Sequence, residues 1–208
     1  MFLISQVCST KFFFGHLCIQ KIKFMFLLFT FLFTQIKALK SDECYSGQLI
    51  IPNGTITIND QEYENCSDFT GPLIIPESVT CIGTNAFFGC NGFTGPLIIP
   101  DSVQSIGSGA FSGCYGFSGI LILPNSIESI KSSTFFNCSG FFGNLTIPDS
   151  VKSIEKDAFS GCYGFNETLT ISNTTESIGS GAFRYCSGFS CTLNLPFKLE
   201  TIESESFF

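Results

Sequence analysis

The stretch FTGPLIIPESVTCIGTNAFFGC at residues 69–90 is followed at residues 93–114 by FTGPLIIPDSVQSIGSGAFSGC, which is nearly the same sequence at a 24-residue offset. The same offset separates six cysteines without one insertion or deletion: Cys66, Cys90, Cys114, Cys138, Cys162 and Cys186. A fixed period of about 20 to 50 residues is typical of solenoids, in which each copy buries its apolar face against its neighbours. The sequence therefore predicts a stack of equivalent coils.

Two columns of aromatic residues follow the same period. The first column is Tyr63, Phe87, Phe111, Phe135, Phe159, Phe183 and Phe207. The second column is Phe69, Phe93, Phe117, Phe141, Phe165 and Phe189. Apolar positions that recur in every copy predict side chains that stack inside a solenoid, so we expect both columns in the core.

One copy, at residues 97–119, predicts the path of each coil. Residues 97–99 alternate like a strand with one face inward, and Pro100 ends this strand because proline cannot donate to a sheet. Residues 103–106 predict a second extended segment, and residues 110–114 have the spacing of a short helical turn. The expected fold is a β-rich solenoid, a right-handed superhelix of stacked parallel strands and short helical turns.

Composition and charge exclude some classes of function. The chain has 26 Phe, 20 Gly and 11 Cys among 208 residues, and 44% of its residues are hydrophobic, which is ample for a core. All 17 acidic residues lie after residue 40, whereas only six basic residues follow residue 38. This acidic excess argues against nucleic acid as a partner, because phosphate binding needs clustered Lys and Arg.

Residues 1–38 have the order of a secretory signal peptide. Two lysines precede the apolar run FMFLLFTFLF at residues 24–33, and the small residue Ala38 stands before the expected cleavage site. A start at Met25 would give a more compact signal. The run is shorter than the about 20 residues that a membrane-spanning helix needs. We expect a secreted or cell-surface protein, held to a membrane only through an anchor that the sequence does not identify.

The remaining chain divides into two parts. Residues 39–48 are expected to form an N-terminal cap segment. Residues 49–208 would form the solenoid, with about 6.7 copies of the 24-residue unit.

The repeat unit resembles the BspA-type leucine-rich repeat. The shared pattern is L-x-I-P-x-S-V-x-S-I-x-x-x-A-F-x-x-C-x-G-F, and the likeness runs from Leu49 to the end of the chain. The sixth copy departs from it, with Ser172 and Thr175 in place of Pro and Val. The resemblance implies a leucine-rich-repeat solenoid. It also implies a secreted or cell-surface protein of a host-associated microbe that binds host matrix proteins or other cells.

One outward column of the first strand is the candidate binding site. It comprises Ile50, Ile74, Ile98, Ile122, Thr146 and Thr170, with Pro72, Pro96 and Ile120 beside it. A row of exposed apolar side chains marks a contact surface, here for a protein or glycan of a host matrix or another cell. Two alternatives remain open for the same residues: the preference of strands for β-branched side chains, or cover by residues 39–48.

Cysteines and sequons fit a secreted protein. The periodic cysteines are expected to be free, small apolar core residues, and Cys44, Cys81 and Cys191, which lie outside the period, are the disulfide candidates. The glycosylation candidates are Asn53, Asn144, Asn166 and Asn173. We expect Asn65 and Asn137 to be less accessible, because their sequons include a core cysteine.

No metal, cofactor or catalytic site is expected. Acid or amide side chains follow the prolines at Asn53, Glu77, Asp101, Asn125, Asp149 and Asn173. This column offers oxygen ligands for Ca²⁺, but turn capping explains the same residues without a metal. The single histidine, His16, lies in the expected signal peptide.

The expected function is therefore an adhesin-like binding module without enzymatic activity. Two alternatives remain: a structural or non-functional fragment of a larger adhesin, and a parallel β-helix enzyme of the polysaccharide lyase type. The oligomeric state is not readable from the sequence.

Secretion of the full chain should be accompanied by cleavage after Ala38, because a charged segment, a short apolar run and a small residue stand in the order that signal peptidase recognises. N-terminal sequencing of the secreted protein measures this directly. A cytosolic product that begins at Met1 or Met25 would contradict the prediction.

Overall fold

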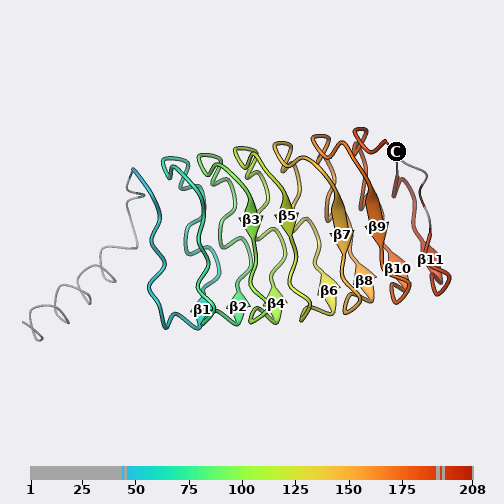
Figure 1. Ribbon diagram of the computed structural model, residues 1–208, viewed down its shortest axis with the longest axis horizontal. Coiled ribbons are helices and arrows are strands. Elements are labelled where there is room, and N and C mark those ends of the chain that lie inside the picture. The colour runs from blue at the N-terminus through green and yellow to red at the C-terminus, as the bar shows by residue number, and fades with distance from the viewer. Residues whose placement is uncertain (1–43, 45, 191–192, 194, 208) are drawn as a thin grey trace, which may run out of the picture. The chain divides into compact units, whose positions relative to one another are not determined.

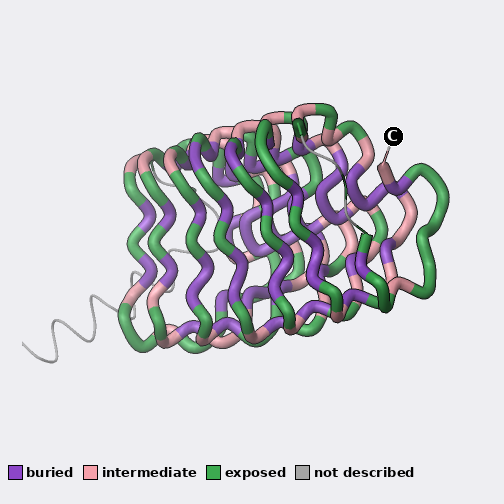
Figure 2. The backbone as a smooth tube through the Cα atoms, turned by 45° about the vertical axis from the view of Figure 1, so that its right-hand side comes forward, coloured by how far each residue is buried: buried purple, intermediate pink, exposed green. Residues whose placement is uncertain are grey.

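The computed structural model describes residue 44, residues 46–190, residue 193 and residues 195–207. The predicted signal peptide and the alternative start at Met25 lie outside these residues, as do Cys191 and most of the predicted cap segment. From residue 44 onward, the described chain forms a parallel β-solenoid of 24-residue coils (Figure 1). Buried and exposed residues alternate along each coil (Figure 2).

The first strand of the coils forms one side of the solenoid. Its strands are β3 (Leu97–Ile98), β5 (Leu121–Ile122), β7 (Leu145–Ile147) and β9 (Leu169–Ile171). Pairing is parallel, with Leu97 opposite Leu121 and Leu145 opposite Leu169. The leucine and the residue two positions later are buried, and the residue between them is exposed, as the alternation in the sequence predicts.

The second strand forms another side. Its strands are β1 (Thr57–Ile58), β2 (Cys81–Ile82), β4 (Ser105–Ile106), β6 (Ser129–Ile130), β8 (Ser153–Ile154), β10 (Ser177–Ile178) and β11 (Thr201–Ile202). They pair in parallel in the order β1-β2-β4 and β6-β8-β10-β11. The isoleucine of each strand up to β10 is buried and the residue before it is more exposed, so this side also turns one face inward.

The segment after the second strand is not the helical turn that its spacing predicts. Among the described residues no helix is assigned, and none is long and apolar enough to cross a membrane. The amides of Ala110, Ser112 and Cys114 donate to the carbonyl three residues earlier. The amides of Gly109, Phe111 and Gly113 donate instead to the next copy.

This alternation is the physical reason for the difference. A helix needs consecutive amides to bond within their own segment, and here every second amide is taken by the neighbouring coil. The same pattern recurs from Gln61 to Phe183, and it continues where sheet pairing is interrupted, between β4 and β6 and between β5 and β7. We call this segment, residues 107–114 and its equivalents, the turn run.

The two aromatic columns lie in the core, as predicted. Adjacent rings within each column have centroids 5.2–5.9 Å apart and planes within 18° of parallel. Phe87 and Phe93, one from each column, meet edge to face with a centroid distance of 6.1 Å. Both geometries are favourable for aromatic rings, so each column adds contact energy beyond simple burial.

The glycine before each phenylalanine of the second column is required by close backbone approach. A Cβ atom on Gly116 would lie 1.9 Å from the carbonyl oxygen of Asn91 and 2.6 Å from that of Phe93. The equivalent glycines of the other copies would meet the preceding copy in the same way. The first copy carries Asp68 at this position. The Gly-Phe pair thus belongs to the stacking of one coil on another.

Replacing Phe111 by Ala should lower the free energy of unfolding by about 3–5 kcal/mol, because this fully buried ring stacks on both neighbours. Phe142→Ala is the matched control: its ring is 50% exposed, and the loss should stay within about 0.5 kcal/mol. Urea unfolding followed by circular dichroism measures both. Equal losses in the two variants would show that the assignment of inward and outward residues is wrong.

Candidate functional site

The outward residues of the first strand lie in one exposed column. Four of them form what we call the isoleucine column: Ile50, Ile74, Ile98 and Ile122, with 76, 60, 53 and 43% of their surface exposed. Backbone pairing sets Ile50 opposite Ile74 and Ile98 opposite Ile122. Because paired strands lie about 4.8 Å apart, paired side chains present neighbouring apolar surfaces.

The neighbouring positions extend this surface. Pro72, Pro96 and Ile120 stand two residues before the outward isoleucines of their coils, and all three are exposed. Thr146 and Thr170 continue the column in the next two coils, exposed and paired with each other. The predicted site residues therefore share one face, which is apolar in the earlier coils and polar in the later ones.

This face carries no charged side chain over its apolar part. Residues 70–76, 94–100 and 118–124 contain no Lys, Arg, Asp or Glu. Charged residues are depleted at the centre of protein–protein interfaces, because their desolvation is costly. An uncharged apolar column with polar residues at one end has the character of such a centre.

The described part of the cap segment continues the solenoid. Gly47 pairs with Phe69 as Gly71 pairs with Phe93. The backbone amide of Gly47 donates to the Asp68 carbonyl, and the Gly47 carbonyl accepts from the Thr70 amide. Residues 46–48 therefore extend the stack by part of a coil, and among the described residues nothing covers the isoleucine column.

The cysteines correct one prediction. Cys44 forms a disulfide with Cys66, the first of the periodic cysteines, which we expected to be free. Two cysteines separated by one full period hold equivalent positions and point in parallel, whereas Cys44 stands 22 residues before Cys66 and so lies out of phase with it. Cys81 is free, and Cys191 lies outside the described residues.

The remaining periodic cysteines are free thiols, as predicted. Cys114 donates to the carbonyl of Phe87 at 3.0 Å, and four others donate to the equivalent carbonyl of the preceding copy. Burial raises the pKa of Cys90 and Cys186 to about 12 and raises the pKa of Cys114, Cys138 and Cys162 well above its usual range. A neutral thiol bonded to a carbonyl is neither a metal ligand nor a nucleophile, because both roles need the thiolate.

The polar column after the prolines serves the turns. The Asp101 carboxylate accepts from the Asn125 amide at 2.8 Å, and the Asp149 carboxylate accepts from the Ser172 hydroxyl at 2.6 Å. Among the described residues there is no group of three or more His, Cys, Asp and Glu side chains that could hold a metal ion. At Asp101 and Asp149 the observed bonds connect one turn to the next, as turn capping does.

Elsewhere on the surface, the ion pair of Lys131 with Glu155 changes the pKa of the carboxylate. Burial alone would raise the pKa of Glu155, but hydrogen bonds from Lys131 at 2.9 Å and from Ser132 outweigh it and lower the pKa. Both charged side chains are partly exposed, so the pair connects two coils at the surface rather than forming a reactive centre.

The sequon asparagines are all exposed, including Asn65 and Asn137, which we expected to be less accessible. The cysteine after each of these two is buried, but the asparagine itself lies in the turn run with its side chain outward. Asn144 and Asn166 use their side-chain oxygens to accept backbone amides at 2.9 Å. Glycosylation of any of these sites stays a prediction.

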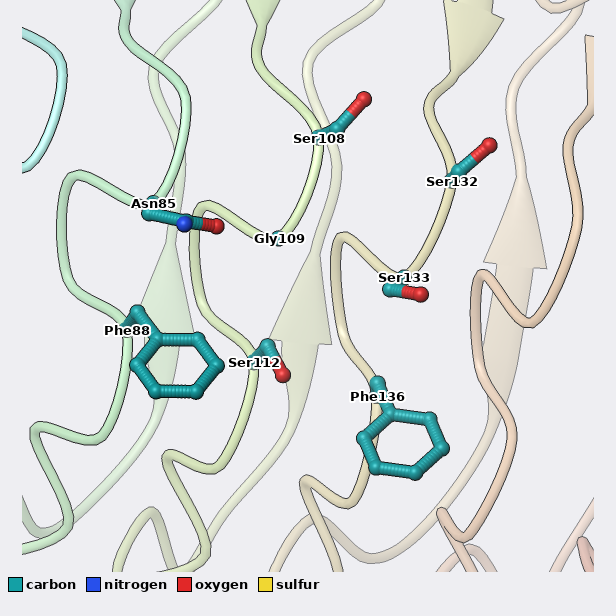
Figure 3. Close-up of a pocket in the computed structure, with 8 residues that line it drawn as sticks. All are labelled: Asn85, Phe88, Ser108, Gly109, Ser112, Ser132, Ser133 and Phe136. Carbon is teal, nitrogen blue, oxygen red and sulfur yellow. The ribbon is translucent and has the colours of Figure 1, made fainter.

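A second surface feature was not predicted from the sequence. Phe88 and Phe136 are exposed on the turn run and flank a pocket of about 330 Å³ (Figure 3). The sequence does contain a signal for it: Phe88 and Phe136 stand at the same repeat position in two copies, and Ser112 stands there in the copy between these two. It was hidden because the shared repeat pattern leaves this position unspecified.

The repeats match a known family model. A sequence model of the BspA type leucine rich repeat region, with six copies, matches residues 34–165 and 118–208. The chain belongs to this family. No curated protein matches the chain. The 24-residue coils, the buried phenylalanines and the Gly-Phe pairs are the structural counterpart of the BspA-type unit.

Solved leucine-rich repeat proteins share the fold. One from Bacteroides ovatus superimposes with a TM-score of 0.62 at 23% identity, over 72% of this chain and 37% of the other. One from Eubacterium ventriosum gives 0.54 at 22% identity, over 68% and 38%. The T. pallidum leucine rich repeat protein gives 0.50 at 23% identity, over 65% and 72%. The chain thus spans little more than a third of the first two.

Native protein at pH 8 should react with iodoacetamide at Cys81 and leave Cys114 and Cys138 unmodified, because burial keeps these thiols neutral and out of contact with the reagent. Peptide mass mapping before and after unfolding in guanidinium measures the labelling. Equal rates at Cys81 and Cys114 in the native protein would contradict the buried column.

The buried periodic thiols Cys90 and Cys186 predict that the folded protein is less stable at alkaline pH. Their pKa is higher in the folded state than the unfolded value of 9.0, so above that pH the unfolded chain loses protons first. The free energy of unfolding, measured by urea titration at each pH, should therefore fall as the pH rises from 9 toward about 12, where Cys90 and Cys186 titrate in the folded protein. Replacing Cys90 and Cys186 by Ala should flatten this fall, and an unchanged slope in that variant would assign the fall to other groups.

Proposed function

We propose that this chain is a secreted or surface-displayed binding module that holds a protein of a host matrix or of another cell against its isoleucine column. The observation that carries the proposal is the continuous, uncharged row of Ile50, Ile74, Ile98 and Ile122, each more than two fifths exposed. Contiguous exposed apolar surface on a folded protein marks interaction sites. A rigid β-solenoid also loses little conformational entropy when it binds.

The disulfide and the family both support a location outside the cytosol. The Cys44–Cys66 disulfide is of a kind that persists in oxidising surroundings outside the cytosol. The predicted signal peptide and the exposed sequons fit the same compartment, and the resemblance to BspA-type repeats implies surface or secreted proteins. Binding rather than catalysis is the activity that this surface supports, because its side chains are aliphatic or hydroxyl groups without a titrating partner.

Converting Ile74, Ile98 and Ile122 together to Thr should reduce binding to the partner at least tenfold, equivalent to about 1.4 kcal/mol, while leaving the melting temperature nearly unchanged. Thr is the residue that the chain itself uses at positions 146 and 170, and it keeps β propensity. Retention of the full-length secreted chain on surfaces coated with fibronectin, laminin or collagen, and on intact epithelial cells, is the measurement.

The matched control changes three exposed residues of one column beside the second strand: Gln104→Thr, Glu128→Thr and Lys152→Thr. This variant keeps the net charge, because one acid and one base are removed together. It should bind as the parent does. If the isoleucine variant is retained as well as the parent, the contact surface lies elsewhere on the molecule.

A further inference from the structure

Exposed phenylalanines occur in alternate copies of the turn run. Phe88 and Phe136 alternate with Ser112 and Ser160 from copy to copy. The shared repeat pattern and the core do not require this alternation, because the two rings lie outside the buried aromatic columns. The exposed rings are therefore free to serve a ligand.

Phe88 and Phe136 flank one pocket, which we call the ring slot. It measures about 330 Å³ and has Ser112 between the two rings (Figure 3). Coils stack at the strand spacing of about 4.8 Å, so two rings that are two coils apart lie about 10 Å from each other. Figure 3 shows both rings broad side toward the viewer, one on each side of Ser112.

Most polar side chains of the ring slot are unused; the exception is Ser132, whose hydroxyl donates to Glu155. Among the described residues, the side chains of Asn85, Ser108, Ser112 and Ser133 make no hydrogen bond, although all four line the pocket. Their hydroxyl and amide groups offer both donors and acceptors. No lining residue is charged. The chemistry of the slot is thus two flat apolar faces with neutral hydrogen-bonding groups between them.

This combination selects among possible occupants. An aromatic or aliphatic side chain of a protein would pack on the rings but would bury the hydroxyl and amide groups without partners, which costs free energy. An anion would meet no positive charge in the slot. A sugar ring has an apolar face of C–H groups and a rim of hydroxyls, so it satisfies both parts of the surface.

We propose that the ring slot binds a neutral oligosaccharide of hexopyranose units. The apolar faces of its sugar rings pack on Phe88 and Phe136, and their hydroxyls bond to Ser112 and the neighbouring serine and asparagine side chains. The slot lies on the turn run, whereas the isoleucine column lies on the first strand. Glycan binding here and protein binding there are separate properties of the chain.

The test is titration of the full-length protein with cellohexaose, maltohexaose, mannohexaose and chitohexaose, each by isothermal calorimetry. At least one should bind with a dissociation constant of millimolar or tighter. Phe88→Ala and Phe136→Ala should each weaken that binding at least tenfold, and Ser112→Ala at least threefold. Controls are Phe142→Ala, an exposed ring outside the slot, and Ser160→Ala, the equivalent serine two copies on; both should bind as the parent does.

Two further variants distinguish binding in the slot from effects of an attached glycan or of the isoleucine column. Asn137 follows Phe136 and belongs to a sequon, so the titration is repeated in an Asn137→Gly background that removes any attached glycan. Glycine occupies the equivalent position in three other copies, at Gly89, Gly113 and Gly161. The Ile74, Ile98 and Ile122 to Thr variant should keep full oligosaccharide binding, even if it loses its protein partner.

Three results would overturn the proposal. The first is no binding of any of the four hexasaccharides in either background. The second is binding that survives loss of both phenylalanines. The third is preference for a charged oligosaccharide, tested with hexagalacturonate, or for a phenylalanine-containing peptide that displaces the sugar, which would assign the slot to an anion or a protein instead.

Discussion

The structure depends on the alternating hydrogen bonds of the turn run. In each copy every second amide donates to the following coil, and the amides between them close local turns. This pattern keeps adjacent coils at the strand spacing and brings equivalent phenylalanines into stacked contact. It also leaves no room for a Cβ atom at Gly116 and its equivalents. The strict 24-residue period is a consequence, since one inserted residue would take these bonds out of register.

The same constraint decides where function can lie. Inward positions must be alike in every coil, so they carry the shared pattern and little individual chemistry. Outward positions are free to vary, and stacking turns any variation into a column on the surface. The isoleucine column and the ring slot are two such variations, one apolar and continuous, the other aromatic in alternate copies and lined with hydroxyl groups.

The disulfide shows where equivalence between copies ends. Cysteines inside the stack donate to a carbonyl of the preceding coil, and burial keeps them neutral. Cys66 belongs to the first full coil, and a cysteine two residues out of phase, Cys44, reaches its sulfur. A periodic residue can therefore have a different role at this end of the stack, where, among the described residues, a full neighbouring copy covers it on one side only.

The sequence by itself determined the period, the parallel stacking, the two buried aromatic columns and the outward position of the isoleucines, because residues one period apart must have equivalent surroundings and a strand alternates its faces. Only the tertiary structure decided that residues 107–114 form no helix, that Cys44 pairs with Cys66, and that Phe88 and Phe136 share one pocket. Each of these depends on hydrogen bonds or contacts between neighbouring coils. Contacts between neighbouring coils cannot be predicted from the spacing of residues within a single copy.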